Sequence, residues 1–190
     1  SVSRGLGDVY KRQVISSHIK ILADVKFMIT LDDDTFMSRE TASKLIGAMA
    51  HILNIPYVKD KKVVRGYGIM QPKIGISLEA KNKTYFSKIF GGDYTVDQYS
   101  TAYSDTYQDL FGEGSFTGKG IINIDEFYNM VNGAIKENKI LSHDLLEGGL
   151  ARSALVSDIE FIDGYPSTYI SSCSRLKRWV RGDWQLIGWL

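Results

Sequence analysis

Three consecutive aspartates, Asp32, Asp33 and Asp34, follow the apolar segment VKFMITL of residues 25–31. An apolar run that stops at charged residues predicts a buried strand that delivers acids to a loop, and α/β proteins place their chemistry at strand ends. Asp32 and Asp34 stand at i and i+2, so their oxygens can hold Mg²⁺ or Mn²⁺ while substrate phosphates complete the coordination. The alternative is a solvated acidic turn or helix cap, although adjacent like charges repel unless a cation joins them.

A further acid stands in the segment LSHDLLEGG, residues 141–149, where Asp144 heads a predicted helix. A carboxylate fixed beside an acceptor hydroxyl can take its proton as a new bond forms, which makes Asp144 a candidate general base. The alternative is an ordinary first-turn acid that the helix dipole stabilises.

Cations and tryptophans alternate near the end of the chain. They are Arg175, Lys177, Trp179, Arg178, Arg181, Trp184 and Trp189. Guanidinium groups suit a diphosphate, and flat aromatic faces suit sugar rings. An amphipathic helix at a membrane interface is the alternative, and both can hold if Arg178 and Trp179 face the site. Nucleic acid is not an expected partner, since 23 basic and 22 acidic residues give no strong global field.

Three other phosphate chemistries fit the sequence poorly. A phosphotransferase loop of the form Asp-x-Asp-x-Thr would start at Asp32, but Thr35 comes one place too early. A P-loop in the glycine-rich segment 112–120, GEGSFTGKG, would need glycine at Glu113 and Ser or Thr at Gly120. The glycine spacing of that segment also misses the dinucleotide fingerprint. Its glycines instead permit close approach of backbone to a ligand.

The chain has 190 residues, of which 44% are hydrophobic, and this length favours one domain. No run of 18 apolar residues occurs, so no bilayer-spanning helix is expected. The lone Cys173 and three scattered histidines predict neither a disulfide nor a zinc site.

Hydrophobic periodicity and turn residues predict the elements that must position these side chains. We expect a helix from a Ser38 cap through Ile52, a strand over 67–76 with Pro72 at an edge or bend, a helix near 85–90, a helix from Asp125, a helix over 143–154, a strand over 156–163 and a last helix from about Thr168. Strands alternating with helices predict an α/β fold. Residues 1–13 have a different, adapter-like character, so we take them as a non-native leader.

Taken in order, LDDDT, GEGSFTGKG, SHD and RLKRW resemble the motifs of family-2 glycosyltransferases with the GT-A fold. Three longer segments narrow the resemblance: SDTYQDLFGEGSFTGKGIINIDEF, LSHDLLEGGLARSALVSDIEFIDGYPS and RWVRGDWQLIGWL. They are similar to the glycosyltransferase domain of cyclic β-1,2-glucan synthases, a family-84 domain related to the family-2 processive enzymes.

The resemblance implies a GT-A-like (Rossmann-like) mixed sheet flanked by helices. It implies a partial domain over residues 14–190 that is incomplete at its N-terminal side and ends in an interfacial helix. Asp32 and Asp34 would bind the metal and the diphosphate of UDP-glucose, with Mg²⁺ or Mn²⁺ as the cofactor.

The same resemblance makes Asp144 the catalytic base, within Ser-His-Asp where many related enzymes carry Thr-Glu-Asp. Arg178 and Trp179 would match the motif Gln-x-x-Arg-Trp and bind the nucleotide sugar, although Arg175 stands where those relatives carry Gln.

The implied activity is inverting transfer of glucose from UDP-glucose to the 2-hydroxyl of a growing β-1,2-glucan acceptor. The implied setting is a larger enzyme at the cytoplasmic face of the bacterial inner membrane, with membrane contact through regions outside this chain. We expect the chain alone to turn over little or nothing. Two alternatives are another polysaccharide synthase of the same fold and a non-catalytic glucan-binding module.

Overall fold

The computed structural model describes residues 24–60, 62–91, 105–132 and 144–189. In chain order the elements are β1 (Phe27–Thr30), β2 (Thr35–Met37), α2 (Thr41–Ala50), β3 (Tyr57–Lys59), β4 (Lys62–Arg65), β5 (Ile69–Ile76), α3 (Leu78–Asn82), α4 (Tyr85–Phe90), α6 (Thr106–Phe111), β6 (Gly120–Asn123), α7 (Ile124–Val131), α8 (Asp144–Ala151), β7 (Ser153–Asp163), α9 (Tyr169–Leu186) and the 3₁₀ turn η2 (Ile187–Trp189). The proposed leader, residues 1–13, lies outside the described residues.

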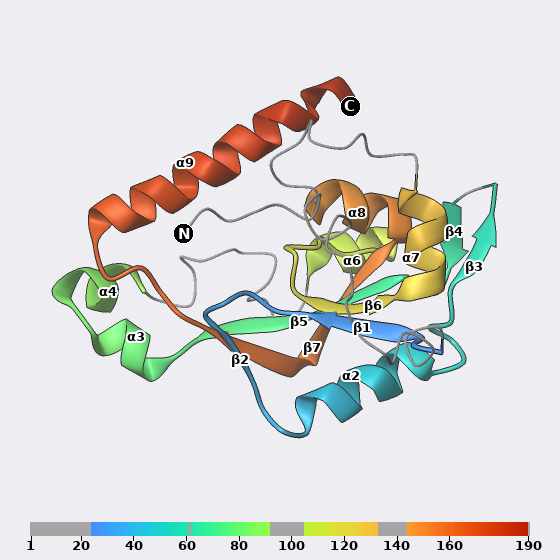
Figure 1. The fold of residues 1–190 in the computed structure, drawn as a ribbon, viewed down its shortest axis with the longest axis horizontal. Helices are drawn as coiled ribbons and strands as arrows, with labels where there is room; N and C mark the ends of the chain where they lie inside the picture. Colours follow the sequence, from blue (N-terminus) through green and yellow to red (C-terminus); the bar gives the residue numbers. More distant parts are fainter. Residues whose placement is uncertain (1–23, 61, 92–104, 133–143, 190) are drawn as a thin grey trace, which may run out of the picture.

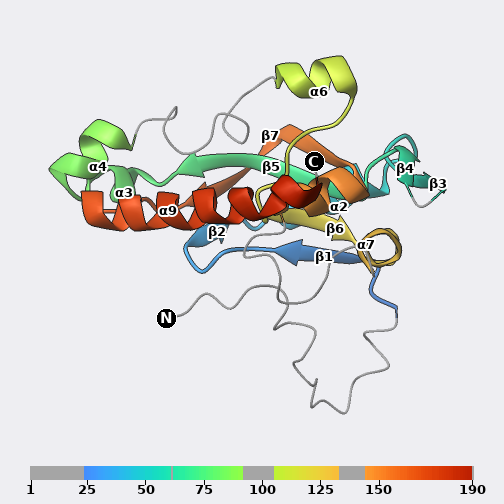
Figure 2. The same cartoon turned by 90° about the horizontal axis from the view of Figure 1, so that it is seen from above.

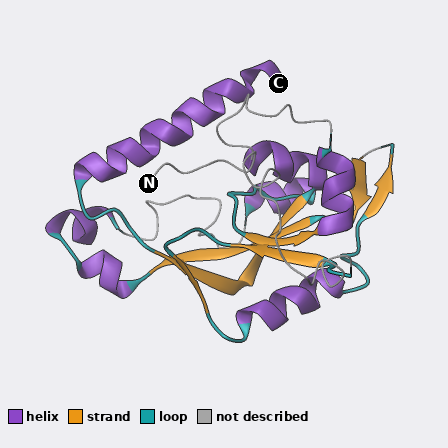
Figure 3. Cartoon of the chain, in the orientation of Figure 1, coloured by secondary structure: helices purple, strands orange, loops and turns teal. Residues whose placement is uncertain are grey.

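The main sheet has five strands in the order β1-β6-β5-β7-β2, and β3 and β4 form a separate two-stranded hairpin. Strands β5 and β7 run parallel, whereas the other neighbours in the main sheet are antiparallel. Helices flank this sheet (Figures 1 and 3). The predicted mixed α/β sheet flanked by helices is thus confirmed, while its GT-A-like character stays a prediction.

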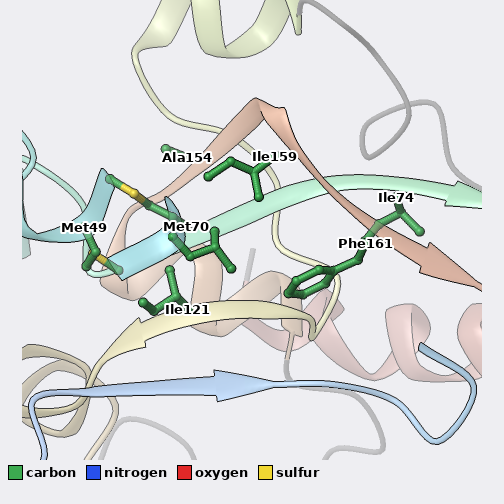
Figure 4. Packing of buried hydrophobic residues seen from close by; sticks show 8 residues of the cluster. Met49, Met70, Ile74, Ile121, Ala154, Ile159 and Phe161 are labelled. Atoms are coloured by element: carbon green, nitrogen blue, oxygen red, sulfur yellow. The ribbon is translucent and has the colours of Figure 1, made fainter. Parts of the chain in front are cut away.

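Strand β5 is central, and its neighbouring side chains enter two different cores. Met70 and Ile121 pack with Leu45 and Phe161, in the cluster drawn in Figure 4. Ile69 and Ile122, each one position away along its strand, pack instead in a second cluster that includes Phe127 on α7. Side chains alternate between the two faces of a strand, so both faces of the sheet are covered.

Helix α2 covers the first of these faces through Leu45 and Met49, both almost fully buried. These two lie four residues apart and therefore on the same helix face, as predicted. The predicted Ser38 cap is wrong, because the helix begins at Thr41 and the Ser38 hydroxyl bonds that of Thr41 at 2.6 Å. The predicted end at Ile52 is also wrong, since that side chain lies beyond α2 and is 78% exposed.

Pro72 lies in the middle of the central strand, so its predicted place at an edge is wrong, and the predicted alternative of a bend stays a prediction. The register between β5 and β7 shifts between Pro72 and Lys73. Proline lacks the N–H that a regular ladder uses, and irregularities of this kind are where strands tolerate it.

Strand β1 ends at the acidic segment as predicted, but it is an edge strand and not a buried one. Among the described strands it pairs with β6 alone, and Met28 is 39% exposed. The apolar run therefore covers one face of the sheet and leaves the other partly open.

The three last predicted elements are present with changed boundaries. Helix α8 stops at Ala151, earlier than predicted, because Arg152 has a positive φ of 55° and Ser153 already pairs within β7. Strand β7 is correspondingly longer than the predicted strand. Helix α9 begins after Thr168, whose hydroxyl accepts from the Ser171 amide at 3.2 Å.

Helix α9 is set apart from the sheet, with its first turn beside α3 and α4 (Figures 1 and 2). Tyr169 at its start contacts Phe86 of α4 edge-to-face, with ring centroids 6.2 Å apart. Its buried residue is Gly182, and most of its other described side chains are exposed. Four of the five predicted site residues line the space between α9 and the loop after β1.

Candidate functional site: an acidic loop facing a basic helix

The acidic loop of Asp32, Asp33 and Asp34 connects β1 to β2 and is fixed by backbone hydrogen bonds. Within the loop, the Thr35 amide donates to the carbonyl of Asp32 at 3.1 Å. From the end of β7, the Gly164 amide donates to the carbonyl of Asp34 at 3.1 Å. The backbone of the loop is therefore attached to the end of β7, although its three side chains are exposed.

Gly164 lets the backbone after β7 approach the acidic loop closely. A Cβ atom on Gly164 would lie 3.0 Å from Oδ2 of Asp34, tighter than an ordinary van der Waals contact. Any larger residue at this position would push against the Asp34 carboxylate.

A cleft of about 710 Å³ opens between this loop and α9. Its lining residues are Asp32, Asp34, Phe36, Ser77, Glu79, Ala80, Lys83, Gly164, Tyr165, Pro166, Ser171, Ser174, Arg175, Arg178 and Trp179. Four of the five predicted site residues are among them, drawn from opposite ends of the chain. The structure thus brings Asp32 and Asp34 to the same cleft as Arg178 and Trp179, and their roles stay predictions.

One face of α9 lines this cleft because its residues recur at helical spacing. Ser171, Ser174, Arg175, Arg178 and Trp179 are three or four residues apart in sequence, which places them along one stripe. Lys177 and Arg181 do not line the cleft, so the predicted basic cluster is divided between two faces.

Arg175 has a structural role that the sequence did not reveal. Its guanidinium carbon lies 4.6 Å from the centroid of the Trp179 ring, a cation–π contact across one helical turn. This contact holds both side chains at the cleft, and it gives a physical use to an arginine at the position where the resembling motif has glutamine.

The candidate base Asp144 does not line the cleft. It is the first residue of α8 and is half-buried, with its carboxylate against Gly118, where a Cβ would be 3.0 Å from Oδ2. Gly118 has a φ of +91°, a conformation that side chains rarely adopt. The other members of the Ser-His-Asp triplet, Ser142 and His143, lie outside the described residues.

A second acid stands one helical turn from Asp144. Glu147 is only 3% exposed, and burial, with a smaller contribution from the charge of Asp144, raises its pKa from 4.5 to about 7. Desolvation disfavours the ionised form of a carboxyl group, so Glu147 is largely protonated below neutral pH.

Sequence reasoning missed two buried charged residues beneath the acidic loop. Lys119, just before β6, pairs with Asp163 at the end of β7, and its Nζ lies 3.1 Å from Oδ2 of Asp32. The hydroxyl of Thr35 donates to Asp163 at 2.6 Å. Lysine is almost always exposed, so the sequence around Lys119 does not predict its burial. Asp163, at the end of an apolar strand, is the one sign of this pair in the sequence.

The number of possible metal ligands at the cleft limits how a cation could be bound. No group of three or more His, Cys, Asp or Glu side chains capable of holding a metal occurs within the described ranges. Asp32 and Asp34 supply two carboxylates at one cleft, and Mg²⁺ is commonly bound by one or two carboxylates, water and substrate phosphates. The residues present therefore fit a cation that arrives with a phosphorylated ligand better than a closed protein cage.

No helix among the described residues is both long enough and apolar enough to cross a membrane. Helix α9 carries exposed apolar side chains, among them Ile170, Val180 and Trp184. Its predicted place at a membrane interface stays a prediction.

The chain is similar to a segment of a known protein. No protein-family profile matches the chain. The chain is similar to cyclic beta-(1,2)-glucan synthase NdvB of Rhizobium meliloti (strain 1021), with 44% identity over 169 residues, or 87% of this chain. The chain spans only 6% of the length of that synthase.

Proposed function

Because the chain is related to a short segment of cyclic beta-(1,2)-glucan synthase NdvB, we propose that it forms the sugar-nucleotide site of a glucan-synthesising glycosyltransferase. The donor is UDP-glucose, the acceptor is a growing β-1,2-glucan, and the domain is of the GT-A type. The larger enzyme acts at the cytoplasmic face of the bacterial inner membrane, with further regions providing the membrane contact.

One observation carries this proposal: the cleft joins Asp32 and Asp34 to Arg178 and Trp179, although these pairs come from opposite ends of the chain. The carboxylates would repel a simple anion, and the guanidinium groups would repel a simple cation. A nucleotide diphosphate with a divalent cation would satisfy both, since Asp32 and Asp34 would hold the cation and the guanidinium groups would bind the phosphate oxygens.

In the proposed reaction Asp32 and Asp34 would hold the divalent cation, which would supply positive charge for the leaving diphosphate. Arg178 binds the diphosphate oxygens, and Trp179 offers a flat apolar face to a sugar ring. Arg175, which stacks on Trp179, holds that ring in position.

The transfer itself forms a bond between the acceptor 2-hydroxyl oxygen and the anomeric carbon of glucose. The bond from that carbon to the diphosphate breaks, and its electron pair leaves with UDP. Asp144 accepts the hydroxyl proton as general base. The attack and the departure occur on opposite faces of the sugar, so the configuration inverts.

The position of Asp144 is compatible with this role through one short segment. Its carboxylate contacts Gly118, and the next residue, Lys119, reaches Asp32. Asp144 and Asp32 therefore both lie beside the two residues that precede β6, although Asp144 lies outside the lining of the cleft.

The proposal is tested by calorimetric titration of the chain with UDP-glucose, with and without Mn²⁺. Binding is expected only with Mn²⁺, and Asp34→Ala is expected to abolish it, because the cation loses one of its two carboxylates. Asp33→Ala is the matched control: it removes the same charge one residue away, from a side chain that does not line the cleft. Metal-independent glucan binding without nucleotide binding would instead favour the non-catalytic module.

A further inference from the structure

Lys119 is a buried cation whose two partners differ in kind. Its side chain is 6% exposed, and it pairs with the Asp163 carboxylate, which is 1% exposed, and with Oδ2 of Asp32, which is 61% exposed. A lysine ammonium has three donors, so it can serve both carboxylates at once. The pair with Asp163 keeps the buried charge neutral, while the contact with Asp32 reaches the cleft.

Asp163 is held on its other oxygen. Its Oδ1 accepts from the hydroxyl of Thr35 at 2.6 Å, and Thr35 is the residue that follows the acidic loop. The buried pair therefore touches the loop on both sides, at Asp32 through the ammonium and at Thr35 through the carboxylate.

The three elements that meet here are distant in sequence. Asp32 leaves β1, Lys119 precedes β6 and Asp163 closes β7, and both β6 and β7 carry core residues of the first cluster. The Lys119–Asp163 pair therefore attaches the exposed acidic loop to strands that belong to the core of the sheet.

We propose that the buried Lys119–Asp163 pair is a positioning device for the acidic loop, which holds Asp32 where it can ligate a divalent cation. This inference rests on the proposed function, because it takes Asp32 and Asp34 as the cation ligands. Lys119 is a positioning residue and not a catalytic one, since it acts through Asp32. Groups that orient metal ligands typically change metal affinity by roughly 10–100-fold when they are removed.

A purely repulsive role for Lys119 predicts the opposite sign. An ammonium beside a cation site lowers its affinity for Mn²⁺ by like-charge repulsion, so removing the charge would then tighten binding. The two readings are separated by the direction of the change in Mn²⁺ affinity.

The test is a titration of the chain with Mn²⁺ alone, in which electron paramagnetic resonance measures the concentration of the free ion. The main variant is the double substitution Lys119→Met with Asp163→Leu, which replaces the charged pair by apolar side chains and leaves no buried charge unpaired. We expect its Mn²⁺ affinity to fall roughly tenfold or more. Unchanged or tighter binding would overturn the inference.

A second readout needs no metal. The Thr35 amide is hydrogen-bonded to the Asp32 carbonyl within the loop, so its exchange with deuterium reports the order of the loop. Exchange at Thr35 is expected to accelerate in the double variant. Phe127→Leu in the second core cluster serves as control, since it lowers the melting temperature without touching the loop and should leave Mn²⁺ affinity and Thr35 exchange unchanged.

Two further variants make the outcome decisive. Asp34→Ala identifies the site: Mn²⁺ binding that it does not affect, or no Mn²⁺ binding by the parent chain, overturns the proposed function and this inference together. Binding that requires Asp34 but ignores the double variant overturns the inference alone. If the double variant does not fold, Thr35→Val decides, because it leaves the charged pair intact and removes the hydroxyl that donates to Asp163. Unaltered amide exchange at position 35 and unaltered Mn²⁺ affinity in that variant would overturn the inference.

Discussion

Arg178 and Arg181 lie three residues apart on α9, both are exposed, and they differ in whether they line the cleft. Arg178→Ala is expected to weaken Mn²⁺-dependent UDP binding by roughly tenfold or more, because a charge-assisted hydrogen bond to phosphate contributes about 1.5–3 kcal/mol. Arg181→Ala removes the same charge from the same helix and should change the affinity less than twofold. Calorimetry on both variants measures the difference, and equal losses would mean that α9 acts only through its overall charge.

Glu147 makes stability depend on pH in a direction unusual for a carboxylate. Its pKa rises from 4.5 to about 7 on folding, chiefly through burial. Between these values the folded chain holds a proton that the unfolded chain has released, so stability falls as pH rises from about 4.5 through 7.

Glu147→Gln removes this pH dependence because glutamine stays neutral. The variant is expected to match the parent near pH 4.5 and to exceed its free energy of unfolding by about 3 kcal/mol above pH 8. Urea denaturation at the two pH values measures this. If the variant and the parent show the same loss of stability with rising pH, Glu147 is not the titrating group.

At the scale of single elements, the loop before β6 depends on a glycine in a conformation closed to other residues. Gly118→Ala forces a side chain into a φ of +91° and places its Cβ 3.0 Å from the Asp144 carboxylate. We expect a loss of about 1–2 kcal/mol in the free energy of unfolding, together with displacement of Asp144.

Gly47→Ala is the matched control, since Gly47 lies in the exposed middle of α2 with nothing within 4 Å of its Cβ position. Alanine there should raise stability by about 0.5–1 kcal/mol, because glycine loses more backbone entropy in a helix. Thermal unfolding of both variants checks the contrast, and a gain from Gly118→Ala would show that the loop is not held in this conformation.

Elements with a strong local pattern could be predicted from the sequence. Strand β5, helix α7 and helix α9 show their apolar periodicity or cap residues directly. Strands β2, β3 and β4 are three or four residues long, which is too short to show a clear apolar alternation. Strand β2 depends on its pairing with the distant β7, and β3 and β4 pair only with each other.

The candidate site divides in the same way. Asp32 and Asp34, and the pair Arg178 and Trp179, were predictable. Their residue types and spacing indicate metal ligation, phosphate binding and stacking on a sugar ring. Lys119 and Asp163 were not, because their significance arises only where β6 and β7 meet beneath the acidic loop. Arg175 was visible as a cation, but its contact with Trp179 depends on helical geometry.

At the scale of the whole molecule, the cleft lies between two parts that meet little elsewhere. The sheet and its flanking helices contain both hydrophobic clusters, whereas α9 contributes mainly exposed side chains. A ligand bridging the acidic loop and α9 would therefore add contacts that the described chain lacks. The chain spans 6% of the length of the glucan synthase to which it is similar.

The most direct test of the central claim is the anomalous scattering of Mn²⁺ in crystals of the chain grown with UDP-glucose. We expect one manganese peak in contact with the carboxylates of Asp32 and Asp34, with the diphosphate beside it and within reach of Arg178. A manganese peak away from this cleft, or a nucleotide bound without contact to these residues, would contradict the assignment of the cleft as the sugar-nucleotide site.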